Sequence, residues 1–345
     1  MEGQTEVRGI DVEAVTRWFR DHITGVQPPL SFSLIAGGHS NLTFKVTDAA
    51  GHDYVLRRPP LSHVLASAHD MGREHKIISA LWPTPVPVPQ ALGFCADPTV
   101  NGAPFYVMAF VDGVVLHDAE IARKSLGEPQ RRATGESFVD VLSDLHDVDV
   151  DAVGLGDLAK KQDYIARQLK RWYGQYQQSK TRELPAVDRV HDALKARIPP
   201  QGRASVVHGD YRLGNCITET AKGQIVAVLD WEICTLGDPL ADVGLLMVYW
   251  SEAGDELSSL PSSPTVLPGF PSRKEIADRY AERSGRDLSR LDFYVAFGYW
   301  KLACIIEGVY ARYVGGAMGA ASTGFEHFGD QVVRLAETAR AAVDG

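Results

Sequence analysis

Two short segments in the second half of the chain place oxygen-bearing side chains directly after apolar runs. The first run leads into Asp210, with Asn215 five residues later, and the second leads into Asp230, twenty residues after Asp210. A carboxylate can orient an attacking hydroxyl group, while an amide oxygen and a second carboxylate can hold Mg²⁺ against phosphate oxygens. The alternative is that Asp210 and Asn215 form turns and Asp230 caps a loop. Turn formation explains one such residue more easily than three at strand ends, so the pattern favours phosphoryl transfer.

Residues beside this trio have less specific roles. Arg212 could neutralise charge on a phosphoryl group during transfer, although a surface ion pair is a competing interpretation. We expect His208 to anchor the loop by hydrogen bonds. Glu232 could assist a metal ion or orient Arg212. Asp238, followed by proline, is typical of a helix start, so we assign it and Asp242 structural roles.

The N-terminal third contains a candidate phosphate loop, Gly37-Gly38-His39-Ser40-Asn41, between two stretches with strand character. Glycine permits close backbone geometry, so main-chain amides of Gly38, Ser40 and Asn41 could approach phosphate oxygens. A Gly-Gly hairpin by itself is usually only a turn. The half-match to the nucleophile elbow of hydrolases lacks the closing glycine, and a strand is expected to follow instead of a helix.

The elements that must position these residues follow from hydrophobic periodicity and turn residues. We expect a β-rich N-terminal part with a leading helix capped by Asp11, and a mostly helical C-terminal part interrupted by a short β segment. Strands are predicted at 32–36, 42–47, 54–57, 91–94, 104–110, 205–207 and 225–229, and helices at 11–23, 67–81, 163–178, 187–198, 273–284, 288–314 and 325–343. An apolar stripe of Phe138, Val141, Leu142 and Leu145 predicts one further helix, with His146 near its end. Residues 251–272 are predicted to be a long loop, either a substrate lid or a disordered excursion.

Composition narrows the possible partners. The 345 residues include 35 Lys and Arg against 44 Asp and Glu, a net charge of −9, which argues against nucleic acid or an anionic membrane as the main partner. The longest apolar stretch, 293–314, contains three charged residues, so we expect no membrane span. Four separated cysteines argue against a zinc site, and no signal peptide is recognisable, so we expect a soluble cytoplasmic protein.

Taken together, the two chemical segments resemble the aminoglycoside/choline phosphotransferase family, whose fold is similar to that of protein kinases. The family pattern is His-Gly-Asp, then Asn five residues after the Asp, then a hydrophobic strand ending in Asp, and all of it is present here. Protein kinases have His-Arg-Asp and Asp-Phe-Gly at these places. The string Asp-Trp-Glu-Ile-Cys-Thr-Leu-Gly-Asp-Pro-Leu-Ala-Asp from 230 to 242 is particularly similar to kinase-like domains associated with acyl-CoA dehydrogenases. The likeness covers roughly residues 30 to 310.

The resemblance implies roles for single residues. It makes Asp210 the catalytic base and Asn215 and Asp230 the metal ligands. Arg57 stands where the kinase strand ends in a phosphate-binding lysine, and Glu74 on the following helix is its expected partner.

The same resemblance makes Phe105–Phe110 the edge strand that leads to the hinge, with adenine against main-chain groups around Met108 to Phe110. Arg58, next to Arg57, should point to the opposite face of its strand.

We therefore predict an α+β, two-lobed protein-kinase-like fold, with a nucleotide-binding lobe at 1–111 and a helical lobe with the catalytic loop and acceptor pocket at 112–345. The predicted activity is transfer of the γ-phosphoryl group of ATP, with Mg²⁺, to a hydroxyl of a small molecule, either aminoglycoside-like or a hydroxyacyl metabolite. The C-terminal helices and residues 251–272 should build the acceptor pocket. The alternative is a catalytically inactive module that binds a nucleotide or metabolite and regulates a partner. It stays open because Arg57 replaces the usual lysine. A metal-dependent hydrolase is a third, weaker option.

Overall fold

The chain divides into two units that are not consecutive in sequence. The computed structural model describes residues 7–36, 41–61, 70–255, 263–315 and 326–344. The first unit comprises Met1–Gly113 with Val226–Glu232, and the second comprises Val114–Ile225 with Ile233–Gly345. The boundary predicted from the sequence lies between residues 111 and 112 and places 226–232 in the C-terminal part. In the structure these residues belong to the first unit.

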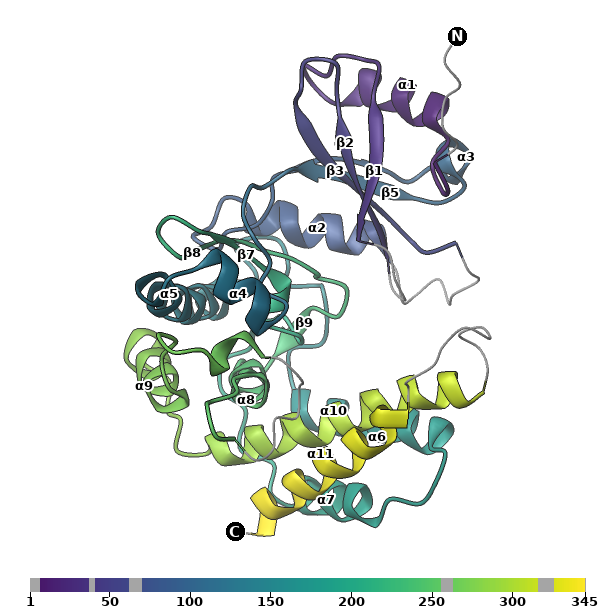
Figure 1. Cartoon of the computed structure of the whole chain (residues 1–345). Helices are drawn as coiled ribbons and strands as arrows, with labels where there is room; N and C mark the ends of the chain where they lie inside the picture. Colours follow the sequence, from purple (N-terminus) through teal and green to yellow (C-terminus); the bar gives the residue numbers. More distant parts are fainter. Residues whose placement is uncertain (1–6, 37–40, 62–69, 256–262, 316–325, 345) are drawn as a thin grey trace. The chain divides into compact units, whose positions relative to one another are not determined.

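An antiparallel sheet of five strands forms the centre of the first unit (Figure 1). Its order is β1-β2-β3-β5-β4, so β3 and β5 are interior and β1 and β4 form the edges. The strands are β1 (Ser31–Ala36), β2 (Leu42–Thr47), β3 (Asp53–Arg58), β4 (Ala91–Cys95) and β5 (Phe105–Ala109), and the helices are α1 (Val12–His22), α2 (Met71–Leu81) and the short α3 (Pro98–Asn101).

The alternation of side chains along β3 separates an apolar core from a polar face. Phe19 of α1 packs in one cluster with Phe44 and Leu56 of the sheet. Because neighbouring residues of a strand point to opposite faces, Arg57 lies on the face away from α1, towards α2. Arg58 lies on the α1 side, where its Nη1 donates to the carbonyl of Asn101 at 2.9 Å. The sequence argument about these two arginines agrees with this arrangement.

Both long helices of this unit begin at an aspartate. Asp11 accepts a hydrogen bond from the main-chain N–H of Ala14 at 2.9 Å, and Asp70 accepts one from Arg73 at 3.0 Å. Such caps satisfy N–H groups that have no partner inside a helix. The predicted cap at Asp11 is confirmed. The second helix begins at Met71, later than the predicted residue 67, because Asp70 is extended and caps it.

The second unit is mostly helical. Two-stranded sheets join β6 to β9 and β7 to β8, and β8 carries the chain back into the first unit. Its helices are α4 (Ala119–Ser125), α5 (Glu128–Asp147), α6 (Tyr164–Ser179), α7 (Pro185–Ala196), α8 (Leu240–Tyr249), α9 (Arg273–Ser284), α10 (Leu291–Val314) and α11 (Glu326–Asp344), with 3-10 turns η1 (Leu213–Asn215) and η2 (Pro264–Val266). The short strands are β6 (Ser205–Val207), β7 (Cys216–Glu219), β8 (Gln224–Val228) and β9 (Thr235–Gly237).

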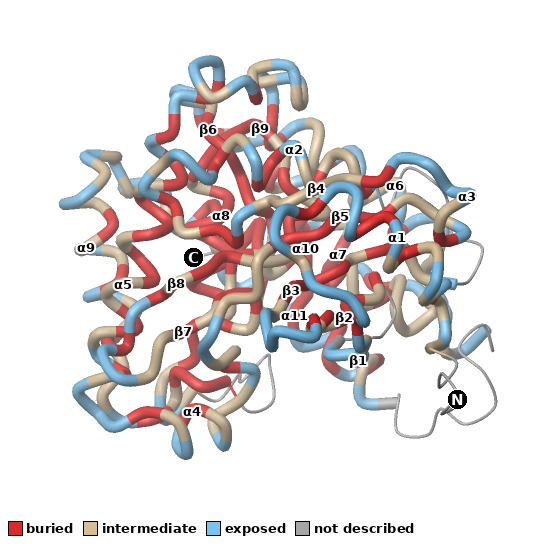
Figure 2. The backbone as a smooth tube through the Cα atoms, turned by 90° about the horizontal axis from the view of Figure 1, so that it is seen from above, coloured by how far each residue is buried: buried red, intermediate tan, exposed pale blue. Residues whose placement is uncertain are grey.

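The helix α10 lies at the centre of this unit's core. It packs against α6, α7, α8 and α11, and Figure 1 shows α10 and α11 side by side. Trp300 and Phe297 of α10 are buried, and α8 is buried along almost its whole length (Figure 2). Two charged residues of α10, Lys301 and Glu307, are buried as well. In the part of the chain that the structure describes, no helix combines the length and apolar character needed to cross a bilayer.

Candidate active site

In the first unit, the predicted phosphate-binding residue Arg57 lies among three carboxylates. Its Nη2 donates to Oδ1 of Asp230 at 2.6 Å, and its Nε lies 3.1 Å from Oε2 of Glu74. Glu232 is more distant, with 4.0 Å between Nη2 and Oε2. The Arg57 side chain is only 11% exposed. Burial opposes its charge, but the acidic groups of Tyr106, Glu74 and Asp230 outweigh that effect, and the pKa of Arg57 lies above its usual value.

Glu74 is the buried partner that the sequence predicts for Arg57. It lies in the first turn of α2, where its Oε2 also accepts from the Tyr106 hydroxyl at 3.0 Å and its Oε1 from Nδ2 of Asn41 at 3.1 Å. Burial raises the pKa of Glu74, although the Arg57 charge acts in the opposite direction. Asn41 also donates to Glu232 at 3.3 Å. Glu74 is 1% exposed and therefore lies inside the first unit, as expected for a partner of Arg57.

Asp230 follows β8 in an unusual backbone conformation. Its φ of 66° lies in the left-handed region, which non-glycine residues seldom adopt and which is often found at functional sites. Trp231 fixes the turn from inside, because its indole nitrogen donates to the carbonyl of Val228 at 3.1 Å. The Asp230 side chain is 29% exposed, and Arg57 takes one of its two oxygens. The other oxygen can serve a further partner.

The predicted adenine-binding strand differs from expectation. The sequence prediction treats 105–110 as an edge strand, but β5 lies between β3 and β4. The N–H of Ala109 donates to the carbonyl of Gln90 at 2.9 Å, so the sheet already uses that group. Met108 is buried inside the sheet. Phe110 follows the strand, and Nζ of Lys45 lies over its ring, 4.7 Å from the ring centre. The predicted phosphate-loop residues Gly38 and Ser40 lie outside the described residues.

In the second unit, Asp210 receives hydrogen bonds on both carboxylate oxygens. Oδ2 accepts from Nδ2 of Asn215 at 2.8 Å and from Nε of Arg212 at 3.2 Å. Oδ1 accepts from the hydroxyl of Tyr249 at 2.6 Å. Asn215 also donates to the main-chain carbonyl of Asp210 at 2.9 Å. The 3-10 turn η1 brings Asn215, five residues further along the chain, back to Asp210, and the amide of Asn215 fixes the carboxylate.

The loop that carries Asp210 is held by two buried charges. The Asp242 carboxylate accepts the main-chain N–H of His208 at 2.7 Å and of Gly209 at 2.8 Å. Lys301 donates from Nζ to the carbonyl of Gly209 at 2.7 Å. Gly209 has a φ of +85°, and a Cβ there would lie 3.2 Å from Ile233, so the loop needs glycine at this place. These bonds fix the main chain directly before Asp210.

His208 and His146 act as structural residues. Nδ1 of His208 accepts the N–H of Asp210 at 3.3 Å, which agrees with its predicted anchoring role. His146 lies between the Tyr280 hydroxyl, 2.7 Å from Nδ1, and Asp242, 3.4 Å from Nε2. Burial lowers the pKa of His146. The pKa of Asp242 is also lowered, since burial is outweighed by hydrogen bonds and charge from the groups around it.

The predicted helix start at Asp238 needs correction. The helix α8 begins at Leu240 with Pro239 as its N-cap, so proline is not at the first helical position. Asp238 still satisfies a helix N–H, that of Leu240 at 3.1 Å, and its other oxygen accepts from the Tyr294 hydroxyl at 2.7 Å. The structural role assigned to this residue fits its burial and both bonds.

The structure therefore assembles the predicted residues in two groups. Asp210, Arg212 and Asn215 lie together in the second unit, and Asn41, Arg57, Glu74 and Asp230 lie together in the first. Convergence of Asp210, Asn215 and Asp230 on one cation stays a prediction. Sequence reasoning did not find Tyr249 or Lys301 as partners of the Asp210 loop. Each is a single polar residue in an apolar helix, and this pattern does not indicate a contact with a distant loop.

Comparisons with known proteins identify the class to which this arrangement belongs. The profile of the phosphotransferase enzyme family matches residues 31–294, and the chain belongs to this family. Mouse acyl-CoA dehydrogenase family member 10 is 36% identical over 313 residues, which cover 87% of this chain and 28% of that protein. The chain spans less than half the length of the curated relatives that it matches.

Solved structures show the same class. A crystal structure from Ralstonia eutropha, provisionally named an aminoglycoside phosphotransferase, has a TM-score of 0.82 and 33% identity, covering 97% of this chain and 98% of that one. Spectinomycin phosphotransferase, solved with ADP and spectinomycin, has a TM-score of 0.61 at 14% identity, covering 96% and 98% of the two chains, which is a likeness of fold alone. The predicted family, its acyl-CoA dehydrogenase-associated branch and the α+β kinase-like fold are confirmed.

Proposed function

We propose that this protein is an ATP-dependent phosphotransferase that moves the γ-phosphoryl group of Mg·ATP to a hydroxyl of a small molecule. The observation that carries the proposal is the Asp210 carboxylate, which accepts hydrogen bonds on both oxygens, while Asp242 fixes the main chain directly before it. A carboxylate held in this way can orient an acceptor hydroxyl for in-line attack. Phosphoryl transfer depends mainly on such positioning and on charge neutralisation.

The nucleotide side of the proposal rests on Arg57. Its guanidinium, held by Glu74, would steady the phosphates that are not transferred, and its planar fork can serve two oxygens at once. Distant fold neighbours solved with ATP or ADP support nucleotide binding. The remaining residues proposed for nucleotide binding are Gly38, Ser40, Asn41, Met108 and Phe110.

Asn215 and Asp230 are the residues proposed to hold Mg²⁺, because each offers an oxygen atom of the kind that this ion prefers. Asn215 directs its amide nitrogen to Asp210, which leaves the amide oxygen for a cation, and Arg57 leaves one oxygen of Asp230 for the same purpose. No group of three or more His, Cys, Asp and Glu side chains forms a metal site among the residues placed in the structure. Mg²⁺ usually takes only one or two protein ligands and completes its shell with phosphates and water. When bound, the ion supplies positive charge beside the phosphates.

The protein's own residues then have defined tasks in the reaction. The acceptor hydroxyl donates to Asp210, which receives its proton as the oxygen attacks the γ-phosphorus. Arg212, 3.2 Å from Asp210 and 40% exposed, would neutralise charge that develops on the transferred group. No covalent enzyme intermediate is needed, since the two substrates react directly.

The acceptor belongs to one of two chemical classes. Relatives more than 30% identical carry acyl-CoA dehydrogenase names, which favours a hydroxyacyl thioester or a related hydroxy acid. The Ralstonia eutropha structure at 33% identity favours an aminoglycoside. We rank the hydroxyacyl class first because several relatives of that name match most of this chain.

Purified protein with Mg·ATP and a panel of both acceptor classes tests the proposal. We expect ADP release and a product heavier by one phosphoryl group with at least one acceptor, and loss of both in Asp210→Ala. Nucleotide binding without product across the panel would favour the regulatory module. Acceptor hydrolysis in the absence of nucleotide would favour the metal-dependent hydrolase.

A further inference from the structure

The hydrogen bonds on Asp210 are unevenly divided between its two oxygens. Each carboxylate oxygen can accept about two hydrogen bonds. Oδ2 already accepts from Asn215 and Arg212, whereas Oδ1 accepts only from Tyr249 among the bonds described. The open acceptor position on this carboxylate therefore lies on Oδ1, beside the phenol oxygen of Tyr249.

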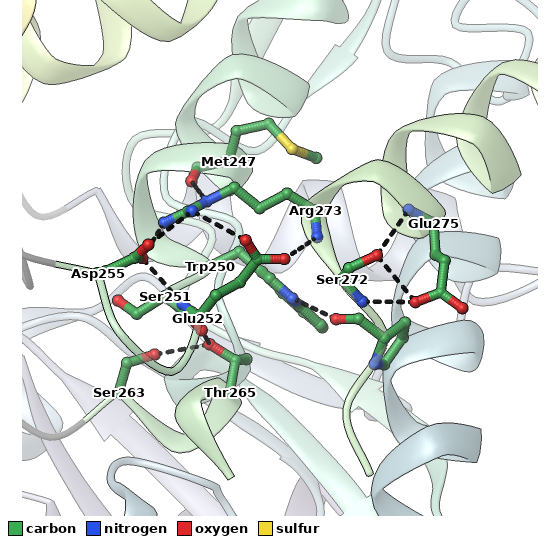
Figure 3. Close-up of polar contacts among 11 residues, drawn as sticks. Met247, Trp250, Ser251, Glu252, Asp255, Ser263, Thr265, Ser272, Arg273 and Glu275 are labelled. Carbon is green, nitrogen blue, oxygen red and sulfur yellow. Dashed lines mark hydrogen bonds and ion pairs between the residues drawn. The ribbon is translucent and has the colours of Figure 1, made fainter. Parts of the chain in front are cut away.

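Tyr249 is the last residue of α8, and the segment that follows holds it firmly. Carbonyl groups at the end of a helix have no partner inside the helix. Ser263 donates to the Tyr249 carbonyl at 3.3 Å, and Arg273 donates from Nε to that of Met247 at 3.2 Å. Figure 3 shows Arg273 reaching the Met247 carbonyl. A cation at this end also interacts favourably with the helix dipole.

Further contacts tie this segment to the helix end. Figure 3 shows Arg273 between Glu252 and Asp255, with 3.3 Å from Nη1 to Oε2 of Glu252 and 3.1 Å from Nη1 to Oδ1 of Asp255. The Trp250 indole, buried next to Tyr249, donates to the carbonyl of Pro271 at 2.8 Å. The described parts of 251–272 are thus tied to α8, and they fix the tyrosine that contacts Asp210.

We propose that Tyr249 is a positioning residue for Asp210 and that the acceptor hydroxyl binds Oδ1 beside it. This inference rests on the proposed phosphotransferase function. The acceptor O–H donates to Oδ1, its oxygen forms a bond to the γ-phosphorus, and the bond from that phosphorus to the bridging oxygen breaks. ADP leaves with the bonding electrons, and the acceptor proton passes to Asp210. Tyr249 keeps its own proton, because its hydroxyl already donates to Oδ1.

The variant Tyr249→Phe tests this role with little change in packing. We expect kcat to fall by about 10- to 100-fold, as for the loss of one hydrogen bond to a charged group, while KM for Mg·ATP changes less than about twofold. Thermal stability should fall less than in the control below, because the Asp210 side chain is 26% exposed and water can replace the lost hydrogen bond. The matched control is Tyr294→Phe, which removes a 2.7 Å hydrogen bond from a buried phenol to Asp238. That variant should lose stability and keep kcat.

The outcomes separate this inference from the proposed function. Wild-type protein that phosphorylates an acceptor, with Tyr249→Phe equal to it in kcat, would overturn the role of Tyr249 alone. Equal losses of stability, nucleotide affinity and kcat in Tyr249→Phe would also overturn it, because they indicate a structural role. Absence of product from the wild type with every acceptor would overturn both proposals.

Discussion

Arg57 and Asp230 form a direct ion pair, with 2.6 Å between Nη2 and Oδ1. The side chain proposed to hold phosphate thus already contacts the side chain proposed to hold the metal ion. The same guanidinium lies 3.1 Å from Glu74 through Nε. One planar group therefore joins strand β3 to both α2 and the turn after β8 within the first unit.

Replacement of Arg57 by lysine should weaken nucleotide binding. Lysine keeps the charge but is a single point donor, so it cannot contact Glu74 and Asp230 through separate nitrogens as arginine does. We expect the Kd for Mg·ATP to rise by about tenfold, corresponding to one charge-assisted hydrogen bond, with an unchanged circular dichroism spectrum. Titration calorimetry measures the affinity. A Kd equal to that of the wild type would show that charge alone is needed.

Much of the fold could be predicted where the signals are local. The bounds of β2 and α9 agree with the prediction at every residue. The helix α9 begins at a capping box formed by Ser272 and Glu275 and ends before Gly285, which adopts the left-handed conformation. Both signals lie within a few residues of the helix end, so the sequence alone was enough.

Elements whose partners are distant in sequence could not be predicted. The strand β9 has three residues and pairs with β6, about thirty residues earlier in the chain. The equally short β6 contains two adjacent valines, which favour a strand, whereas Thr235-Leu236-Gly237 has no such run, so nothing local marks β9 as a strand. The assignment of 105–110 as an edge strand was wrong for a similar reason, because sheet order depends on where β4 pairs.

The same distinction holds for the site. Asn215 lies five residues from Asp210, and a local turn brings them together. Tyr249 is 39 residues from Asp210, and Lys301 is 92 residues from Gly209, so only the packing of α8 and α10 shows these contacts. Sequence reasoning found the residues proposed for chemistry together with Glu74 and His208 as residues that hold them, and it missed Tyr249 and Lys301.

Asp242→Asn should impair both stability and turnover. The carboxylate accepts two main-chain N–H groups, and an amide would place its own NH₂ group against one of them. We expect a loss of about 2 kcal/mol or more, since a buried donor is left without an acceptor. We also expect kcat to fall by about 100-fold as the Asp210 loop shifts. Chemical unfolding and steady-state kinetics measure the two effects.

Asp144→Asn provides the matched control for that variant. Asp144 pairs with Arg283 at 2.8 Å near the surface, where ion pairs contribute about 1 kcal/mol or less. It should therefore leave kcat unchanged and stability nearly so. Equal effects of the two substitutions would contradict the role assigned to Asp242.

The buried His146 should make stability depend on pH in the mildly acidic range. Burial lowers its pKa below 6.5 in the folded protein, so the unfolded chain binds a proton there that the folded chain does not. The neutral His146 therefore makes its full contribution to the free energy of unfolding at pH values above the pKa of the unfolded chain. This contribution is lost as the pH falls towards the lower pKa of the folded protein. The slope contributed by one such proton is at most about 1.4 kcal/mol per pH unit.

Denaturant unfolding of the wild type and of His146→Gln, repeated at several pH values, measures this effect. The variant should show a shallower loss of stability below the unfolded pKa. Two other histidines with lowered pKa values, His75 and His117, are present in both proteins and cancel in the comparison. Parallel curves for the two proteins would contradict the prediction.

Nucleotide titration and turnover in Asp210→Ala and Asp230→Ala test the central claim most directly. We expect Asp210→Ala to bind Mg·ATP with an affinity within about threefold of the wild type while turnover falls by about 1,000-fold or more, as for loss of a positioned base. Asp230→Ala should instead weaken binding of Mg·ATP by about tenfold or more, through lost charge near the metal ion. Unchanged affinity in Asp230→Ala, or near-normal turnover in Asp210→Ala, would contradict the proposed division of roles between these two carboxylates.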